Sequence, residues 1–398
     1  MPHRLECTVQ RYAWGDRSTL PALLGIPGDG GPYAELWMGA HPGAPSLIDG
    51  HALNELIAAD PERYLGVGFP VGGTTARREL PMLFKVLAAA HPLSVQAHPS
   101  TTQAAAGFGR EQALGLPLDA PNRTYRDANH KPELLCAVTR FEARCGFRPV
   151  DETLALLDEI ACDAVAPLQD LLRRAVGGTV EPKAALAAGL RWLLELDREQ
   201  SAALTSAVVA AALDGAQGSR YEHERLACGP LAAAFPRDIG VIVLLLLNHV
   251  LLEPGQALFL GPGVLHAYLG GVGMELMANS DNVVRGGLTS KHVDVDELLR
   301  IVDTTPGAAA IETPISPVHT FSTPAPEFSL TRVELDESTD LPVAGPAIVL
   351  LTAGAAWLDG YGPVRKGEPL FIEAAEGART LKGTAAAGLG WIARPGPV

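Results

Sequence analysis

The periodicity of apolar residues changes twice along this chain of 398 residues, and these changes limit the folds that it can adopt. In residues 151–239, apolar side chains recur three and four positions apart, as at Leu154 and Leu157, which predicts a block of helices with Asp151 as the first N-cap. Before and after this block, short apolar runs alternate with Gly- and Pro-rich turns, roughly one every ten residues, which is typical of jelly-roll or barrel sheets. We therefore expect an α+β fold in which helices interrupt the β-sheets.

The order of these stretches predicts the domain organisation. The simplest arrangement is one β domain built from residues 1–150 and 240–300, into which residues 151–239 insert as a helical domain, with a second β domain over residues 301–398. Pro182 is expected at the start of one inserted helix, where the missing N–H has no helical partner to lose. A chain of this length is long enough for two or three domains, each with its own core.

Composition argues against several classes of partner. The net charge of −14 disfavours binding to nucleic acid or to an anionic membrane surface, because both need a basic surface. The most apolar stretch, residues 240–252, is shorter than the roughly 20 residues of a membrane-spanning helix and contains Asn248 and His249, so we expect a buried core segment. The amino terminus has no secretory signal pattern and the five cysteines form no CxxC pair, so we expect reduced thiols and a cytoplasmic location.

Gln96 and His98 occupy alternate positions of a short predicted strand in the segment "PLSVQAHPS". Side chains two residues apart in a strand point to the same face, so the amide and the imidazole could bind a single ion. Taken alone, such a pair is more often the solvated face of a half-buried strand. A metal site therefore needs support from other segments.

Three further segments gather polar groups between apolar strands. Lys131 and Glu133 share a strand face in "YRDANHKPELL", and "GPGVLHAYLGG" places His266 and Tyr268 on one face in the same way. A salt-bridged turn is the structural alternative for the first of these segments, and a surface hairpin is the alternative for a third segment, "ELMANSDNVVRGGLTSKHVD". Around a Gly-Gly turn, this third segment contains Asp281, Arg285 and Lys291.

Four of these residues form a ligand set without thiolates. Two imidazoles, one carboxylate and one weak neutral amide suit a borderline divalent ion such as zinc, with positions left open for a substrate. In the usual cluster of cupin oxygenases a glutamate follows an HxH motif closely, whereas here the glutamate lies 35 residues after the first histidine. This spacing favours a Lewis-acid site over a redox iron site. The four residues are Gln96, His98, Glu133 and His266.

Several motifs resemble those of type I mannose-6-phosphate isomerases. They lie in the first 150 residues and in about 250–294, and they are "VQRYAWG", "AELWMGAHP", "FKVL…PLSVQAHP", "DANHKPEL" and "GPGVLHAYLGG…MELMANSDNVVRGGLTSKHVD". The helical block and the carboxy-terminal region match that family only in length and in the pattern of apolar residues and turns. The resemblance implies a cupin-type catalytic domain with a helical insertion, followed by a second jelly-roll domain.

The resemblance also implies a reaction and a role for each site residue. These enzymes interconvert mannose 6-phosphate and fructose 6-phosphate through an enediolate, with one zinc ion acting as a Lewis acid. The family's zinc ligands fall on Gln96, His98, Glu133 and His266. Arg285 and Lys131 are then expected to be catalytic. The substrate-binding residues are expected to be Ser94, Tyr268, Asp281 and Lys291, with the first and the last near the phosphate.

The sequence leaves alternatives open. Lys131, Asp281 and a zinc-bound water are rival candidates for the group that moves the proton. Family members often carry an acidic residue and a lysine after the QxHP motif, where this chain has Ser100 and Thr101, so a positive group near the phosphate is missing there. A zinc isomerase of another, unphosphorylated sugar and a non-catalytic sugar-binding cupin are therefore alternative functions. We expect a monomer, with an oligomer as the alternative.

Overall fold

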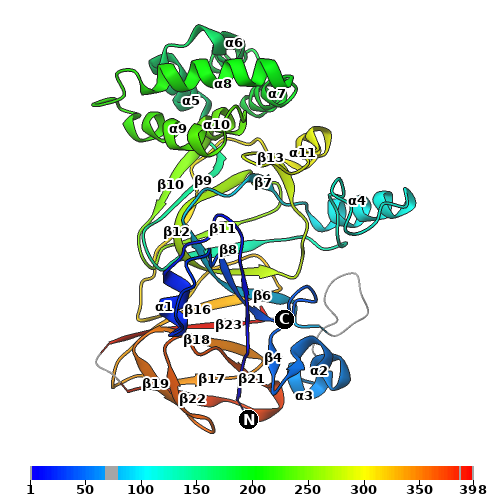
Figure 1. Ribbon diagram of the computed structural model, residues 1–398, viewed down its shortest axis with the longest axis vertical. Helices are drawn as coiled ribbons and strands as arrows, with labels where there is room; N and C mark the ends of the chain where they lie inside the picture. The colour runs from blue at the N-terminus through cyan, green and yellow to red at the C-terminus, as the bar shows by residue number, and fades with distance from the viewer. Residues whose placement is uncertain (1, 68–78, 385–386, 397–398) are drawn as a thin grey trace.

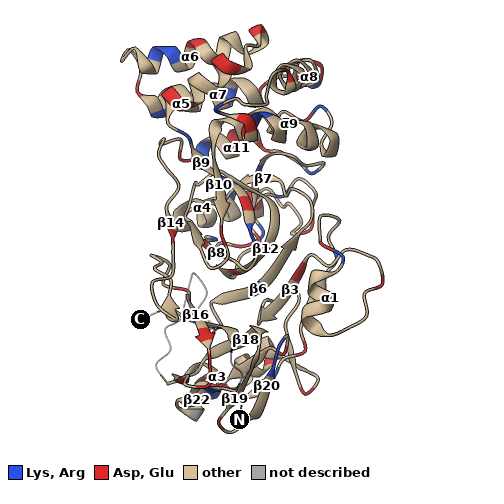
Figure 2. Ribbon diagram, turned by 90° about the vertical axis from the view of Figure 1, so that its left-hand side faces the viewer, with Lys and Arg blue, Asp and Glu red and all other residues tan. Residues whose placement is uncertain are grey.

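The computed structural model describes residues 2–67, 79–384 and 387–396, and its elements form three layers along the long axis (Figure 1). A helical layer lies at one end, a strongly curved β-sheet in the middle, and two further sheets at the other end, where the chain begins. The same layers are seen from the side in Figure 2, where acidic and basic residues are spread over all three.

The middle layer is organised by one long strand, β12 (His266–Ala278). Its first residues pair with β7 (Val95–Ala97) and β9 (Phe141–Phe147), and its later residues pair with β6 (Met82–Ala89) and β8 (Glu133–Ala137). Because one strand takes part in both sets of pairs, the sheet curves into a barrel-like shape (Figure 1). The other strands of this sheet are β2 (Thr8–Gln10), β3 (Glu35–Gly39), β10 (Leu247–Leu252), β11 (Ala257–Leu260), β13 (Val284–Gly287) and β14 (Ile311–Glu312).

The layer at the opposite end from the helices is a sandwich of two sheets. One sheet contains β1 (His3–Arg4), β15 (Val318–Thr320), β16 (Ser329–Leu335), β18 (Ala347–Ala353), β21 (Leu370–Ile372) and β23 (Gly388–Arg394). The other contains β17 (Asp340–Val343), β19 (Ala355–Leu358), β20 (Gly362–Arg365) and β22 (Arg379–Gly383). The two sheets enclose an apolar core that includes Val333, Val349, Leu358 and Leu381.

Two short strands each pair with a strand that is far away in the sequence and belongs to the other predicted β domain. β1, at the start of the chain, pairs with β21 of the sandwich, and β14 extends the middle sheet beside β11. The middle layer and the sandwich also share an apolar core that includes Phe84, Leu134, Met274, Phe328, Leu350 and Trp391. The sandwich thus contains a strand from residues 1–150, and the middle sheet contains a strand from residues 301–398. The predicted division of the chain into domains stays a prediction.

The helical layer follows the predicted periodicity. α7 (Pro182–Leu194) begins at the proline, as predicted. α5 (Val150–Ile160) begins one residue before Asp151, with Pro149 in the N-cap position, so the prediction that Asp151 caps this helix was wrong. Its carboxylate instead lies in the first turn, where the helix dipole favours a negative charge. The other elements of this layer are η1 (Asp163–Val165), α6 (Ala166–Val176), α8 (Arg198–Leu213), α9 (Glu222–Ala234), α10 (Gly240–Val243) and η2 (Leu244–Leu246).

The apolar stretch 240–252 is confirmed as a core segment. It forms α10 and η2, whose residues are buried in the core of the helical layer, and then enters the middle sheet as β10. Among the described residues, no helix has both the length and the apolar character needed to cross a membrane. The remaining elements are α1 (Thr19–Leu24), β4 (Leu47–Ile48), β5 (His51–Ala52), α2 (Leu53–Ala59), α3 (Pro61–Leu65), α4 (Thr101–Ala113), α11 (Val295–Ile301) and η3 (Ala374–Glu376).

Helix α4 starts directly after the segment that carries Gln96 and His98. The Ser100 hydroxyl accepts from the backbone N–H of Gln103, and the Gln103 side chain accepts from the backbone N–H of Ser100, which is a complete capping box. Ser100 therefore has a structural role as the N-cap of α4. Farther along, α4 packs closely on the ring of Tyr125, whose hydroxyl donates to Glu297 of α11.

We predict that Gly107→Ala destabilises the protein. A Cβ atom at this buried helical position would lie 2.3–2.5 Å from ring carbons of Tyr125, so overpacking should cost about 1–3 kcal/mol of unfolding free energy. The control is Gly109→Ala in the same helix, where a Cβ meets no atom within 4 Å and should add about 0.5–1 kcal/mol. Urea denaturation measures both variants, and equal midpoints would contradict this packing.

Candidate metal centre and substrate site

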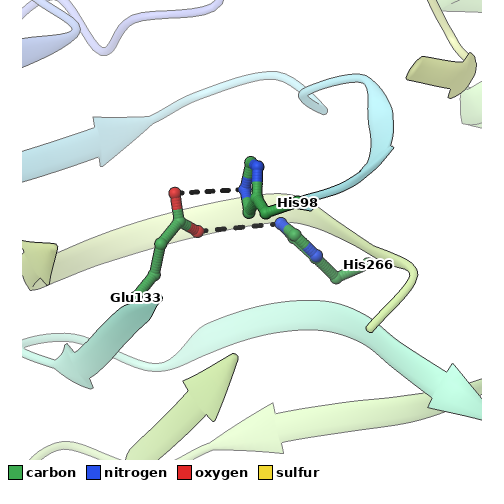
Figure 3. Close-up of side chains that lie close together, drawn as sticks. All are labelled: His98, Glu133 and His266. Carbon is green, nitrogen blue, oxygen red and sulfur yellow. Dashed lines mark ion pairs between the residues drawn. The ribbon is translucent and has the colours of Figure 1, made fainter. Parts of the chain in front are cut away.

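Three side chains from separate strands converge at one point in the middle layer. His98 follows β7, Glu133 begins β8 and His266 begins β12, and Figure 3 shows the two imidazoles directed at the carboxylate. His98 Nε2 lies 3.3 Å from Glu133 Oε1, and His266 Nε2 lies 3.7 Å from Glu133 Oε2. All three side chains are at most 2% exposed. The three donors are thus close enough to bind one ion.

The backbone fixes the orientation of both imidazoles. His98 Nδ1 lies 2.9 Å from the carbonyl oxygen of Asn282, and His266 Nδ1 lies 2.9 Å from that of Val264. With Nδ1–H donating to a carbonyl, the lone pair of Nε2 points to the centre. Burial lowers the pKa of His98, and it lowers that of His266 to about 4. Both rings are therefore neutral at pH 7, which is the form that binds a metal.

Gln96 lies next to this cluster as the sequence predicted. Its neighbours Val95 and Ala97 are buried in the core of the helical layer, so Gln96 projects from the other face of β7. It is opposite His266 in the strand register, and its Nε2 lies 3.4 Å from His266 Nε2. The amide oxygen, which accepts from the Ser94 hydroxyl at 3.4 Å, is the candidate fourth ligand.

The residues present fit a zinc ion. Burial raises the pKa of Glu133, but His98, once protonated at low pH, and the Lys131 ammonium outweigh burial and hold this pKa well below its usual value, so Glu133 is a carboxylate at pH 7. His98 Nε2 and Glu133 Oε2 are buried and have no hydrogen-bond partner among the described residues. Unpaired buried polar atoms are costly unless another group satisfies them. Two neutral imidazoles, a carboxylate and an amide form a ligand set that zinc accepts.

Positive side chains lie beside the centre. The Lys131 ammonium is 3.2 Å from Glu133 Oε1 and its side chain is 10% exposed. Arg285 is opposite Gln96 in the pairing of β13 with β7. Burial and the charge of Arg126 lower the pKa of Arg285, and burial and the charges of both arginines lower the pKa of Lys291. These three cations, Arg126, Arg285 and Lys291, therefore form one group, which we call the cation cluster.

Asp281 and Tyr268 differ strongly in exposure. The Asp281 side chain is 49% exposed, with Oδ1 3.5 Å from His41 Nε2. Tyr268 is buried in the apolar interior of the barrel, edge-on to Phe141, and its ring centroid is 5.9 Å from that of His266. Burial raises the pKa of the Tyr268 hydroxyl far above its usual value, so it stays protonated.

The segment after β12 supports His98. Asn282 is fully buried, and its side-chain amide donates to the backbone oxygens of Asp127 and Asn129 and accepts from the N–H of Arg126. The carbonyl of Asn282 is the group that holds His98 Nδ1. The motifs "RDANHKPEL" and "ANSDN" therefore position each other, and together they position a ligand of the centre.

Sequence reasoning missed a buried charge network next to the centre. Lys85 Nζ lies 2.9 Å from Glu275 Oε2 and 3.5 Å from Glu35 Oε1. Burial lowers the pKa of Lys85, but the two carboxylates outweigh it and raise this pKa, while burial raises the pKa of Glu275 to about 6. The charge of Glu133 acts on both groups, which places the network near the centre. The available signal was a single lysine in the apolar strand "MLFKVLAA". Arg126 was also missed, although it directly precedes "DANHKPEL".

We predict that the metal-free protein loses stability as the pH falls from 7 to 5. The pKa of His266 is about 4 in the folded state but about 6.5 in an unfolded chain, so between these values the unfolded state binds more protons and is favoured. After chelation, the urea midpoint should fall across this range, and it should fall less for His266→Gln. The matched control is His51→Gln at an exposed site in β5, which should keep the full pH dependence. An equal fall in both variants would contradict a neutral, buried His266.

Comparison with known proteins assigns the family. A family model described as phosphomannose isomerase type I, catalytic domain, matches residues 3–150. The mannose-6-phosphate isomerase of Escherichia coli (strain K12) is 38% identical over 396 residues, covering 96% of this chain and 97% of the relative. That of Rattus norvegicus is 33% identical over 414 residues, covering 94% and 93%.

Solved structures agree over the whole chain. The mannose 6-phosphate isomerase of Salmonella typhimurium, described as bound to its substrate and to zinc, superimposes with a TM-score of 0.87 at 35% identity and covers 100% of both chains. The predicted α+β fold and the resemblance stated from the motifs are both confirmed. The chain belongs to the type I phosphomannose isomerase family.

Proposed function

We propose that this chain is a zinc-dependent aldose–ketose isomerase that interconverts mannose 6-phosphate and fructose 6-phosphate. The observation that carries the proposal is the buried convergence of His98, Glu133 and His266, with both imidazoles neutral and oriented by backbone carbonyls. Relatives that align over nearly the full chain are named mannose-6-phosphate isomerase, and a structural neighbour contains both zinc and fructose 6-phosphate.

The chemistry follows from the groups around the centre. The isomerisation removes a proton from the carbon next to a carbonyl, forms an enediolate and returns the proton to the neighbouring carbon. One zinc ion, held by the four predicted ligands, would supply Lewis acidity for the sugar oxygens. Arg285 lies beside Gln96 and is always charged, so it offers fixed positive charge as the enediolate develops.

Lys131 is our candidate for the group that moves the proton. Its side chain is 10% exposed and its Nζ lies 3.2 Å from a carboxylate oxygen of the metal centre, so it is within reach of a sugar bound there. The rival Asp281 is 49% exposed and lies beside His41. A buried amine next to the centre is better shielded from bulk water than this carboxylate is.

The cation cluster is our candidate for the phosphate end of the site. Arg126, Arg285 and Lys291 gather like charges whose mutual repulsion a phosphate dianion would relieve. We propose that Arg126 supplies the positive charge that is missing after the QxHP motif, where Thr101 begins α4. The Ser94 hydroxyl, bonded to Gln96, is the proposed neutral contact between the phosphate end and the metal ligands.

This arrangement favours a phosphorylated substrate over the alternatives. A cluster of positive side chains on a chain of net charge −14 attracts an anionic ligand such as a sugar phosphate, whereas a neutral sugar gains no charge attraction from it. A non-catalytic sugar-binding protein would not need a buried lysine and a complete ligand set side by side. We also propose that the chain acts as a cytoplasmic monomer, and its unpaired cysteines support a reducing compartment.

We predict that activity on mannose 6-phosphate requires zinc bound at Glu133. In an assay coupled to fructose 6-phosphate formation, a chelator should abolish turnover and added zinc should restore it. Glu133→Gln keeps the shape but loses the negative charge, so zinc content and kcat/KM should both fall, the latter by more than about 100-fold. The control is Glu55→Gln, an exposed carboxylate of α2. Full activity of the chelated enzyme would refute the proposed function.

We predict that the cation cluster sets the affinity for the phosphate. Arg126→Gln and Lys291→Ala each remove a charge-assisted contact worth about 1.5–3 kcal/mol, so each should raise KM for mannose 6-phosphate roughly 10- to 100-fold with a smaller fall in kcat. Lys183→Ala is the control, because Lys183 is an exposed lysine that pairs with Asp303. If KM is unchanged in both cluster variants, the phosphate does not bind at the cation cluster.

A further inference from the structure

A second cluster of metal-binding side chains lies on the outer surface of the barrel. Glu142 comes from β9, His249 from the neighbouring strand β10 and His223 from α9 of the helical layer. Phe141, Ala143 and Val250 alternate with these residues along the strands and point into the barrel core, so Glu142 and His249 point outward. The cluster is thus separate from the centre formed by His98, Glu133 and His266.

The donor spacing of this cluster matches that of the first centre. His249 Nε2 lies 3.3 Å and His223 Nδ1 lies 3.9 Å from Glu142 Oε1. The corresponding distances from the two imidazoles to Glu133 are 3.3 and 3.7 Å. In each cluster, one donor atom from every member lies within 4.8 Å of the others. Two imidazoles and a carboxylate at this spacing form a ligand set for a borderline divalent ion.

We infer that Glu142, His223 and His249 bind a second divalent transition-metal ion, of the zinc, cobalt or nickel class, with water in the open positions. The Glu142 and His249 side chains are 29% and 16% exposed and are held by adjacent strands, whereas the His223 side chain is 51% exposed. The two imidazoles stack at 4.0 Å with their planes 22° apart. Stacked rings direct their nitrogen lone pairs side by side, so binding one ion jointly with His249 would require the His223 ring to turn, and its exposure on α9 leaves it free to do so.

The positive and negative side chains around the second cluster roughly cancel, so we expect a lower affinity for a cation here than at the first centre. Arg144, opposite His249 in the strand register, is buried and opposes a cation. Arg148 also carries positive charge, but it pairs with Glu224 at 2.9 Å. Glu142 offsets the charge of Arg144, and Glu222 in the first turn of α9 offsets the positive end of that helix.

Such an ion would link two layers of the molecule. Two ligands belong to the barrel and one belongs to α9, so binding would fasten the helical layer to the outer surface of β9 and β10. A ligand that binds only the folded state raises stability in proportion to the logarithm of its concentration over Kd. The expected effect of the second ion is on stability, while turnover stays unchanged.

The test is a metal titration of enzyme that already contains one zinc per chain. Calorimetry with nickel chloride should detect one further equivalent in the wild type, together with a rise in Tm. Both effects should be absent in His223→Ala and in Glu142→Gln, which alter partly exposed side chains, and present in the control His51→Ala. Isomerase activity should be within about twofold of wild type in all three variants.

Two outcomes would overturn the inference. One is a wild-type protein that takes up no ion beyond the first, and the other is a second equivalent that persists in both His223→Ala and Glu142→Gln. Activity serves only as the control for an intact first centre. Failure of this inference, which concerns a site apart from the proposed active centre, is therefore distinct from failure of the proposed isomerase function.

Discussion

The buried Glu133 carboxylate between two neutral imidazoles is the interaction on which the rest of the structure depends. A carboxylate that is 2% exposed is costly unless positive or hydrogen-bonding groups compensate it. The Lys131 ammonium supplies one positive charge, and a metal ion bound jointly with His98 and His266 would supply the rest, although these residues are far apart in the sequence. The curved sheet brings them together, because the first part of β12 contacts β7 and its last part contacts β8. The capping box of α4 and the carbonyl of Asn282 then hold His98 in place.

The charge near the metal centre differs in sign from that of the whole chain. An overall charge of −14 would repel a phosphorylated sugar, yet the cation cluster gathers three positive groups, one of which, Arg285, lies opposite Gln96 in the strand register. The charge of Lys85 is not available to an anion, because Glu275 and Glu35 neutralise it inside the barrel. Positive groups near the centre thus divide into one network that compensates buried carboxylates and one cluster that remains available to an anion.

Local patterns predicted the parts of this structure that depend on neighbours in the chain. Two-residue spacing placed Gln96 and His98 on one face and Lys131 beside Glu133, and apolar periodicity located the helical layer and the start of α7. The pairing of β1 with β21 and the association of Lys85 with Glu275 could not be predicted in this way, because they join residues far apart in the sequence. The N-cap assignment of Asp151 failed because Pro149 already sets the backbone for helix entry.

Anomalous diffraction at the zinc absorption edge, on crystals grown with fructose 6-phosphate, tests the central claim most directly. We predict a strong peak among Gln96 Oε1, His98 Nε2, the Glu133 carboxylate and His266 Nε2, with donor distances of about 2.0–2.2 Å. The sugar should lie against it with its phosphate at the cation cluster. A well-occupied zinc bound elsewhere while this position holds none, or a sugar phosphate bound away from it, would contradict the account.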